Sequence, residues 1–116
     1  MDFNNHVNNV KYLEWLVQIA SEHFYSKGFD IEFMKNNNFT WVTKYHYIEY
    51  KSPSFLGDEL IIKTWIDHFK RVSGIRKYEI LKDKKLIVKA ESEWVFFDTQ
   101  KNKPSRIPDY IINSFN

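Results

Sequence analysis

The spacing of hydrophobic residues along this chain changes once, near residue 40. Before that point, apolar residues recur at three- and four-residue steps, at Val10, Leu13, Val17, Ala20 and Phe24. This spacing places them on one face of an amphipathic helix. Asn8 or Asn9 is suited to cap the start of the helix, because an asparagine side chain accepts from the free first-turn N–H groups. Gly28 is suited to end it, because glycine adopts the left-handed conformation readily.

After residue 40 the chain becomes rich in β-branched and aromatic residues, which is typical of strands. The pattern predicts strands at 41–51, 59–69, 72–81 and 86–98. The links Lys70-Arg71 and Asp83-Lys84 are short enough for antiparallel hairpins. We also expect a helical turn at 30–35, a polar loop at 99–105 and a short helix opened by Pro108.

Together these elements predict one α+β domain over residues 1–116, with one long helix and an antiparallel sheet. The apolar face of the sheet has to be covered, and only the long helix is large enough to cover it. Apolar residues make up 43% of the chain and aromatic residues 18%, which favours a packed core over disorder.

Composition excludes several classes of function. The chain has no cysteine, so disulfides, thiolate nucleophiles and cysteine-based zinc sites are absent, and no histidine pair has metal-ligand spacing. The net charge of +2 and the lack of a basic stripe argue against a nucleic-acid partner. No apolar run is long enough to span a membrane, and the polar start is unlike a signal peptide. We therefore expect a cytoplasmic protein without a bound metal.

Reactive polar groups stand directly before the predicted long helix. Asp2, Asn4 and His6 occupy alternate positions. A helix N-terminus has free N–H groups and favours negative charge, which suits an oxyanion that develops during acyl transfer. Asp2 can attack an acyl group or deprotonate water, His6 can share the role of base or orient the substrate, and Asn4 can hold water or the carbonyl. The alternative is that these residues only cap the helix, with His6 in a loop.

The segment from Asp2 to Trp15 closely resembles the signature of hotdog-fold thioesterases. The nearest similarity is to the acyl-ACP thioesterase branch, and acyl-CoA thioesterases of the 4-hydroxybenzoyl-CoA type have a similar segment. Residues 50–60, 94–98 and 106–108 are similar to later parts of the family pattern. The resemblance implies a hotdog fold, in which a curved antiparallel sheet wraps a central helix. It also implies homodimers or homotetramers with active sites between subunits.

The resemblance also implies site residues. Asp2, Asn4 and His6 match the catalytic positions of the acyl-ACP branch. Backbone N–H groups from Val7 to Val10 are the expected oxyanion donors. The substrate-binding residues that we predict are Val7, Asn8, Asn9, Tyr12 and Arg71. Lys70, Arg71 and Arg76 are suited to meet the phosphates of CoA or of a carrier protein's pantetheine arm, and the alternative is a solvated basic turn. His23 is expected to be a partly buried, hydrogen-bonded histidine rather than a ligand.

Three positions depart from the family pattern. The family has a strand before its signature, whereas this sequence starts at the signature, so we expect either a trimmed chain or a sheet without that strand. Asn5 stands where the acyl-CoA branch has glycine, which favours the acyl-ACP branch. That branch carries a catalytic glutamate after the first strand that follows the helix, but residues 51–54 contain no carboxylate, and Glu49 and Asp58 only flank them.

The sequence therefore predicts a hydrolase that cleaves acyl-ACP or acyl-CoA to a free acid and a thiol. No cofactor is needed, because water and protein groups suffice for thioester hydrolysis. One alternative is a non-catalytic module that binds or senses acyl thioesters on the same fold. Another is a hotdog dehydratase, which also uses a histidine and a carboxylate, although the segment 7–12 resembles the thioesterases more.

Overall fold

The computed structural model describes residues 8–116, which form three helices and five strands in the order α1, α2, β1, β2, β3, β4, β5 and α3. The helices are α1 (Asn9–Ser26), α2 (Ile31–Asn36) and α3 (Asp109–Ser114). The strands are β1 (Phe39–Tyr50), β2 (Ile61–Phe69), β3 (Ser73–Lys82), β4 (Lys85–Asp98) and β5 (Lys103–Pro104).

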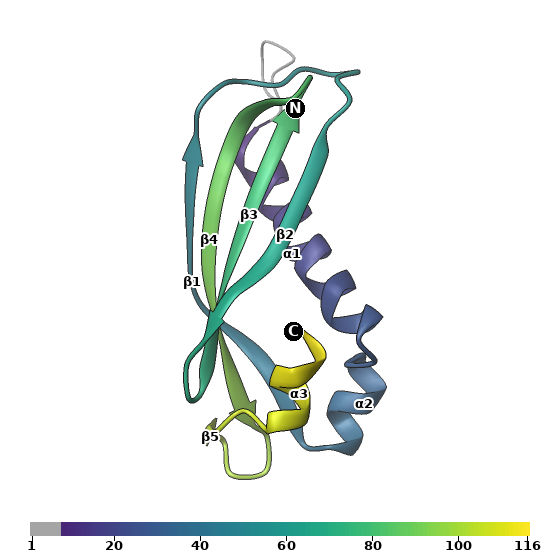
Figure 1. Ribbon diagram of the computed structural model, residues 1–116, viewed down its shortest axis with the longest axis vertical. Coiled ribbons are helices and arrows are strands. Elements are labelled where there is room, and N and C mark those ends of the chain that lie inside the picture. Colours follow the sequence, from purple (N-terminus) through teal and green to yellow (C-terminus); the bar gives the residue numbers. More distant parts are fainter. Residues whose placement is uncertain (1–7) are drawn as a thin grey trace.

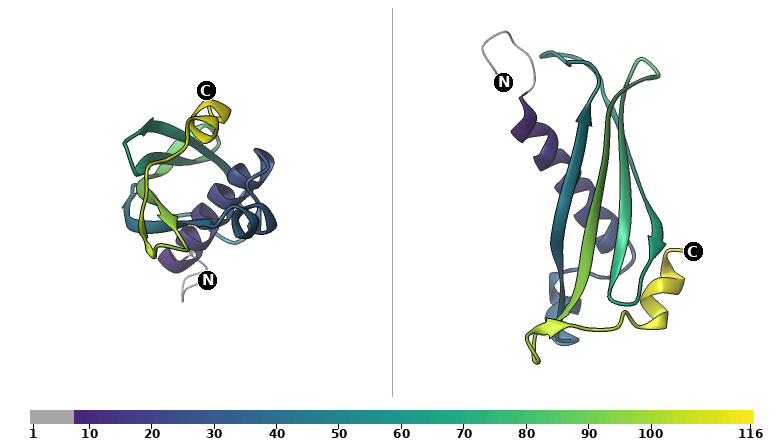
Figure 2. Two further views of the ribbon diagram at one scale, coloured as in Figure 1. Left: turned by 90° about the horizontal axis from the view of Figure 1, so that it is seen from below. Right: turned by 90° about the vertical axis from the view of Figure 1, so that its left-hand side faces the viewer.

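The strands form one antiparallel sheet in the order β1-β4-β3-β2, with β5 paired to β4 beside this path. The sheet is long and curved, and α1 runs along its inner side (Figures 1 and 2). The shorter helices α2 and α3 lie near the end of the sheet where β1 begins (Figure 1). The predicted α+β architecture, with one long helix on an antiparallel sheet, is therefore confirmed.

The hairpin between β3 and β4 has the expected two-residue turn. Asp83 and Lys84 both have positive φ, at 50° and 67°, which matches the right-handed twist of the strands that they join. The turn between β2 and β3 is wider, and the Lys70 N–H donates to the Ser73 carbonyl oxygen at 2.7 Å. The short strand β5 was not predicted, because residues 99–105 are polar and carry only two residues of pairing.

Both ends of α1 agree with the sequence. The Asn8 side chain accepts from the Lys11 N–H at 3.0 Å, so Asn8 is the N-cap. At the other end Gly28 has a φ of 91°, its N–H donates to the Tyr25 carbonyl oxygen, and the Phe29 N–H donates to the Phe24 carbonyl oxygen. These two bonds form a Schellman motif, which satisfies the last carbonyl groups of the helix.

The buried face of α1 differs from the predicted face. Its buried residues are Tyr12, Leu16, Ala20 and Phe24, whereas Val10 is 65% exposed and Val17 is 36% exposed. The buried residues follow each other at four-residue steps. Only Ala20 and Phe24 belong to both the predicted face and the observed face. The reason lies in Tyr12, whose ring is apolar enough to be buried and whose hydroxyl finds a partner inside the protein.

Two hydrophobic clusters hold α1 against the sheet. The cluster under the first half of the helix is mostly aliphatic and contains Tyr12, Leu16, Ala20, Tyr78, Ile80, Ile87, Val88 and Ala90. The cluster under its end is mostly aromatic and contains Phe24, Phe29, Phe39, Phe96, Ile107 and Ile111. The helix therefore lies between two differently built halves of one core, and its start is anchored by the aliphatic half.

Candidate functional site

The start of α1 is the region in which the sequence places the active site. Asp2, Asn4, His6 and Val7 lie outside the residues that the structure describes, so their roles stay predictions. The described part begins with Asn8, which caps the helix, and the first turn of α1 contains no acidic residue. The first-turn N–H groups therefore keep the positive end of the helix dipole without a carboxylate from that turn beside them.

Asn9 and Tyr12 follow the cap and face different surroundings. Asn9 is exposed, and its carbonyl oxygen accepts from the Tyr50 hydroxyl at 3.4 Å. Tyr12 is only 2% exposed, and its hydroxyl lies 2.5 Å from the hydroxyl of Ser54, which is fully buried. The Tyr12 ring also packs against Trp15 and Tyr50, with centroids 5.7 Å and 5.6 Å away. Tyr12 therefore fixes the helix start to the segment between β1 and β2.

An apolar groove adjoins this helix start. It has a volume of about 310 Å³ and is lined by Lys11, Trp15, Phe55, Leu56, Gly57, Asp58 and Leu60. Leu56 is 75% exposed, so apolar surface stays open to solvent at the edge of the groove. A groove of this kind can hold a hydrocarbon chain or the thin pantetheine arm of a thioester.

Glu49 and Asp58, the two carboxylates that flank residues 51–54, both pair with lysines that lie outside α1. The Asp58 carboxylate accepts from the Phe55 N–H at 2.7 Å and pairs with Lys82 at 3.0 Å, and these contacts lower its pKa. Glu49 pairs with Lys51 at 2.9 Å, which lowers the pKa of Glu49. The residue of this segment that meets the start of α1 is Ser54.

Within one chain, Arg71 lies far from Asn8, Asn9 and Tyr12. It is exposed in the turn between β2 and β3, where its carbonyl oxygen accepts from the Ile107 N–H at 2.9 Å. This turn is at the end of the sheet opposite the start of α1 (Figure 1). The structure thus brings together Asn8, Asn9 and Tyr12, and it leaves Arg71 apart from them.

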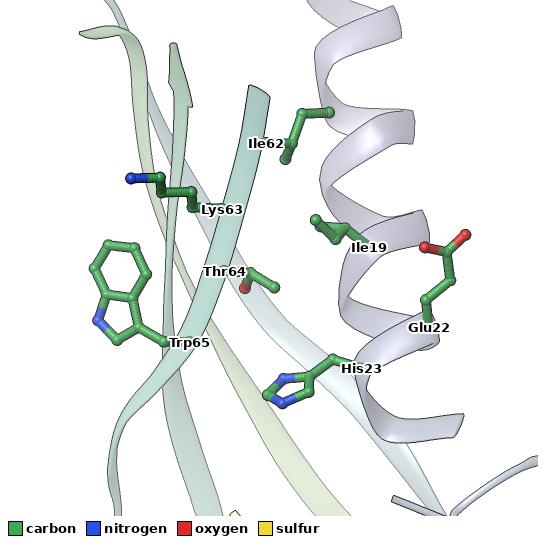
Figure 3. A pocket seen from close by; sticks show the side chains of 7 residues that line it. All are labelled: Ile19, Glu22, His23, Ile62, Lys63, Thr64 and Trp65. Carbon is green, nitrogen blue, oxygen red and sulfur yellow. The ribbon is translucent and has the colours of Figure 1, made fainter. Parts of the chain in front are cut away.

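A second polar cluster lies under the end of α1. Arg76 of β3 is fully buried, and its Nη1 lies 3.0 Å from His23 Nδ1 and donates to Thr64 Oγ1 at 3.0 Å. Burial lowers the pKa of Arg76 to about 10, so it stays charged at neutral pH. The prediction that His23 is a partly buried, hydrogen-bonded histidine is confirmed. His23 and Thr64 line a cavity between α1 and β2 (Figure 3).

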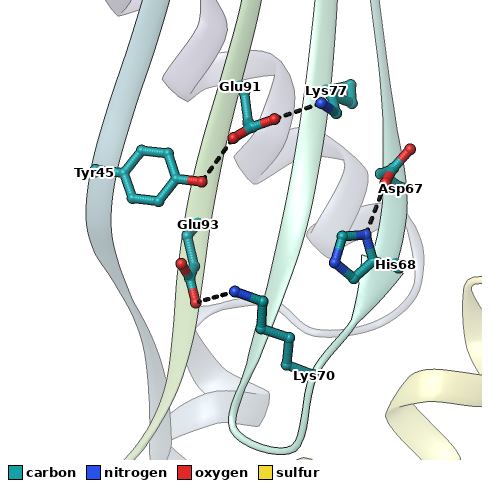
Figure 4. Close-up of polar contacts among 7 residues, drawn as sticks. All are labelled: Tyr45, Asp67, His68, Lys70, Lys77, Glu91 and Glu93. Atoms are coloured by element: carbon teal, nitrogen blue, oxygen red, sulfur yellow. Dashed lines mark hydrogen bonds and ion pairs between the residues drawn. The ribbon is translucent and has the colours of Figure 1, made fainter.

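The outer face of the sheet carries ion pairs that satisfy one another (Figure 4). The Glu91 carboxylate accepts from Lys77 and from the Tyr45 hydroxyl, and this carboxylate raises the pKa of Tyr45 to about 12. The buried Glu93 carboxylate accepts from Ser73 at 2.7 Å and from Lys70 at 3.5 Å. The carboxylates of Glu91 and Glu93 each have a hydroxyl and an ammonium partner. We therefore assign these ion pairs a role in stabilising the sheet.

Within residues 8–116, no group of three or more histidine, aspartate or glutamate side chains is arranged to hold a metal ion. In the same part of the chain, no helix is both long and apolar enough to cross a membrane.

Sequence reasoning missed two of these contacts. Gly74, Arg76, Tyr78 and Ile80 are two residues apart along β3. The two-residue period of a strand therefore places Arg76 on the same inner face as the other three. That signal was available in the sequence, but a charged residue on an apolar face is easily assigned to solvent. Ser54 gave no such signal, since a serine beside a proline in a polar segment is typical of an exposed turn.

Comparison with known proteins identifies the family. The family model described as the Thioesterase-like superfamily matches residues 1–115, and this chain belongs to that superfamily. No curated protein sequence matches the chain. The predicted resemblance to hotdog-fold thioesterases and the predicted hotdog architecture are both confirmed.

Solved structures share this fold at low sequence identity. A Staphylococcus aureus protein in complex with CoA is 18% identical, with a TM-score of 0.92, and the match covers 98% of this chain and 73% of that chain. A 1,4-dihydroxy-2-naphthoyl-CoA thioesterase from Synechocystis is 16% identical, with a TM-score of 0.87 and coverages of 99% and 86%. An acyl-ACP thioesterase from Bacteroides thetaiotaomicron is 25% identical, with a TM-score of 0.86, and the match covers 92% of this chain and 44% of that chain.

Proposed function

We propose that this protein hydrolyses acyl thioesters, either acyl-CoA or acyl-ACP, to a free acid and a thiol. The observation that carries the proposal is the match to the thioesterase superfamily, which includes the segment with Asp2, Asn4 and His6. The capped start of α1 and the apolar groove beside it support this assignment, since they supply a dipole for the carbonyl oxygen and a surface for the acyl or pantetheine chain.

In the proposed reaction, Asp2 attacks the thioester carbonyl carbon or deprotonates a water that attacks it. The carbonyl oxygen gains negative charge, which first-turn N–H groups of α1 and the Asn4 side chain stabilise. The carbon–sulfur bond then breaks, and the thiolate takes up a proton that His6 can supply. Where Asp2 itself attacks, a water then hydrolyses the acyl–Asp2 anhydride, which releases the free acid and restores the carboxylate. Water is the only co-reactant on either route, so the proposed reaction needs no cofactor.

The proposed assembly is a homodimer or homotetramer in the cytoplasm, with active sites between subunits. Arg71 lies at the end of the sheet opposite the start of α1, so its predicted contact with a phosphate would serve an active site to which a second copy contributes. Sedimentation of the purified chain tests the oligomeric state, and a monomer at micromolar concentration would contradict this part of the proposal.

The activity is tested by incubating the protein with panels of acyl-CoA and acyl-ACP substrates and following the release of free thiol. We expect Asp2→Ala and His6→Ala each to lower kcat/KM by about a hundredfold or more, as removal of a general acid or base does. Asp109→Ala, at an exposed position on α3, is the matched control and should keep full activity. Unchanged activity in both site variants would contradict the assigned site.

The alternative function is a module that binds acyl thioesters without cleaving them. One observation favours it, because the flanking carboxylates Glu49 and Asp58 both pair with lysines and residues 51–54 contain no carboxylate. Saturable binding of an acyl-CoA with no release of thiol, in protein that melts cooperatively, would support this alternative over hydrolysis.

A further inference from the structure

A short turn at residues 55–58 lies in the segment that joins β1 to β2. Leu56 at its tip is 75% exposed, and Gly57 has a φ of 92°, a conformation that glycine adopts readily. All four residues of the turn line the groove beside the start of α1, together with Lys11, Trp15 and Leu60. The position of this turn therefore sets the width of the groove.

The turn is closed by hydrogen bonds between its own two ends. The Asp58 carboxylate oxygen Oδ2 accepts from the Phe55 N–H at 2.7 Å, and the Asp58 N–H donates to the Phe55 carbonyl oxygen at 3.1 Å. Because both bonds join one end of the turn to the other, they fix its internal shape. They do not fix where the turn lies relative to the helix and the sheet.

A second hollow adjoins the turn on the side of the β3–β4 hairpin. It has a volume of about 440 Å³ and is lined by Ser52, Pro53, Phe55, Lys82, Asp83, Lys85 and Ile87. The hairpin and the segment that holds the turn lie at the same end of the sheet as the start of α1 (Figures 1 and 2). Phe55 thus borders one hollow next to α1 and another next to the hairpin, so the turn has room to move away from the groove.

Lys82, the last residue of β3, contacts both ends of the turn. Its Nζ lies 3.0 Å from Asp58 Oδ2, the oxygen that also accepts from the Phe55 N–H, and 5.3 Å from the centroid of the Phe55 ring. Only 31% of the Lys82 side chain and 21% of the Asp58 side chain are exposed, so salt screens this pair less than a fully exposed one. The Phe55 N–H, and then Lys82, hold the pKa of Asp58 below its usual range, so the carboxylate is ionised at neutral pH.

The sheet holds Lys82 itself in place. Lys82 pairs with Lys85 across the two-residue turn of the β3–β4 hairpin. On the other side, Ser54, the residue directly before the 55–58 turn, lies 2.5 Å from the Tyr12 hydroxyl of α1. The turn is therefore attached to the helix through Ser54 and to the sheet through Lys82.

We propose that Lys82 is a positioning residue, which holds Asp58 and Phe55 so that the 55–58 turn stays at the distance from α1 that fits a bound thioester chain. The role in substrate binding rests on the proposed function, whereas the attachment of the turn does not. The turn lines the groove and supplies no group to the proposed reaction. Loss of Lys82 therefore weakens binding of the substrate and of the transition state alike, which raises KM and leaves kcat unchanged.

Steady-state kinetics of two lysine variants test the role in binding, with the thioester that the native protein cleaves fastest. Lys82→Met removes the charge at a similar side-chain length, and we expect KM to rise about fivefold while kcat stays within about twofold of the native value. Lys85→Met is the matched control, because Lys85 is exposed at the facing position of the hairpin and has no ion-pair partner among residues 8–116. Its KM should change by no more than about twofold. An equal rise of KM in both variants would show general attraction to charge and would overturn the proposal, as would an unchanged KM or a lower kcat in Lys82→Met.

Amide hydrogen exchange tests the attachment of the turn without any substrate. Asp58 Oδ2 protects the Phe55 N–H, so Lys82→Met should raise the exchange rate of this N–H by about fivefold or more, while the Lys11 N–H, which is bonded to the cap Asn8, keeps its rate. Asp58→Asn removes the other charge of the pair, and the double variant should exchange no faster than the faster of the two single variants. An unchanged rate in Lys82→Met, or additive increases in the double variant, would overturn the proposal. If the native protein released no thiol, the proposed function would fail, and these exchange rates would still decide whether Lys82 holds the turn.

Discussion

The two ends of α1 differ in how completely their buried polar groups are paired. At the start, the Asn8 side chain serves the Lys11 N–H, and the buried hydroxyls of Tyr12 and Ser54 serve each other. At the end, buried Arg76 has hydrogen-bond partners among residues 8–116 for Nη1 alone. A buried polar group without a partner costs free energy, so the first arrangement stabilises the chain and the second carries a cost that its described contacts do not offset in full.

The packing around the two ends explains why the charge is tolerated at one of them. The first half of α1 rests mostly on aliphatic residues, and within residues 8–116 no cation stacks on the rings of Tyr12 or Tyr78 there. The end rests on aromatic residues, and the Phe24 ring, which stacks on Trp41 at 4.9 Å, also presents its face to Arg76. Because an aromatic face attracts a cation, the aromatic half of the core is where a partly paired arginine can be held.

The largest expected effect tests the aliphatic half. Leu16 is 1% exposed under the first half of α1, and Leu16→Ala should lower the free energy of unfolding by about 3 kcal/mol, because it loses buried methyl groups and leaves a cavity. Urea denaturation measures this change. The neighbouring Val17→Ala, on the exposed side of the same helix, should cost less than about 1 kcal/mol. Equal losses at the two positions would contradict the helix face described above.

The next largest effect tests the hydrogen bond between Tyr12 and Ser54 at the start of α1. Tyr12→Phe leaves the buried Ser54 hydroxyl without its partner and should lower the free energy of unfolding by about 1–2 kcal/mol. The double variant Tyr12→Phe with Ser54→Ala removes both hydroxyls and should lose less than the sum of the two single variants. Additive losses in that double-mutant cycle would mean that the two hydroxyls do not interact. Tyr110→Phe, at an exposed tyrosine of α3, is the control.

At the C-terminal end of α1, a substitution is expected to raise rather than lower the free energy of unfolding. Arg76→Met removes a buried charge whose Nε and Nη2 donors have no partner in the described part of the chain, and it should raise the free energy of unfolding by about 1 kcal/mol. Urea denaturation measures the change. A loss of stability instead would mean that the contacts to His23, Thr64 and Phe24 already balance the charge, and the contrast between the two ends would disappear.

Much of the fold could be predicted because it follows from local chemistry. The strand boundaries agree to within two residues, and Asn8, Gly28 and the Asp83-Lys84 turn do what their residue types favour. The face of α1 was shifted, because the predicted face left out Tyr12, whose partner Ser54 lies 42 residues away in the sequence. A contact between distant segments decided the face, and the local pattern does not contain that contact.

The candidate site divides in the same way. The helix cap could be predicted, since Asn8 and the Lys11 N–H lie three residues apart, whereas Asp2, Asn4 and His6 stay predictions. The contacts of Arg76 with His23 and Thr64 join β3 to α1 and β2, and they depend on how these elements pack. The position of Arg71 also depends on topology, because the order of the strands places its turn far from the helix start.

The smallest expected effect is a dependence of the free energy of unfolding on pH, which arises from His23 at the end of α1. Burial is the main cause that lowers the pKa of His23, with Arg76 and Lys27 adding to it, while the unfolded chain keeps a histidine pKa near about 6.5. Below that value the unfolded state binds more protons, so the stability that neutral His23 contributes is lost as pH falls through its folded pKa. Burial lowers the pKa of His46 as well, which acts in the same direction.

We therefore expect a lower free energy of unfolding at pH 5.5 than at pH 7.5, measured in urea. His23→Phe should reduce this difference, because it removes one of the two described histidines whose pKa is lowered by burial. Val17→Ala, at an exposed apolar position of the same helix, should leave the difference intact. If the phenylalanine variant kept the full difference, protonation of His23 would not be linked to folding, and the cation beneath it would not govern the end of α1.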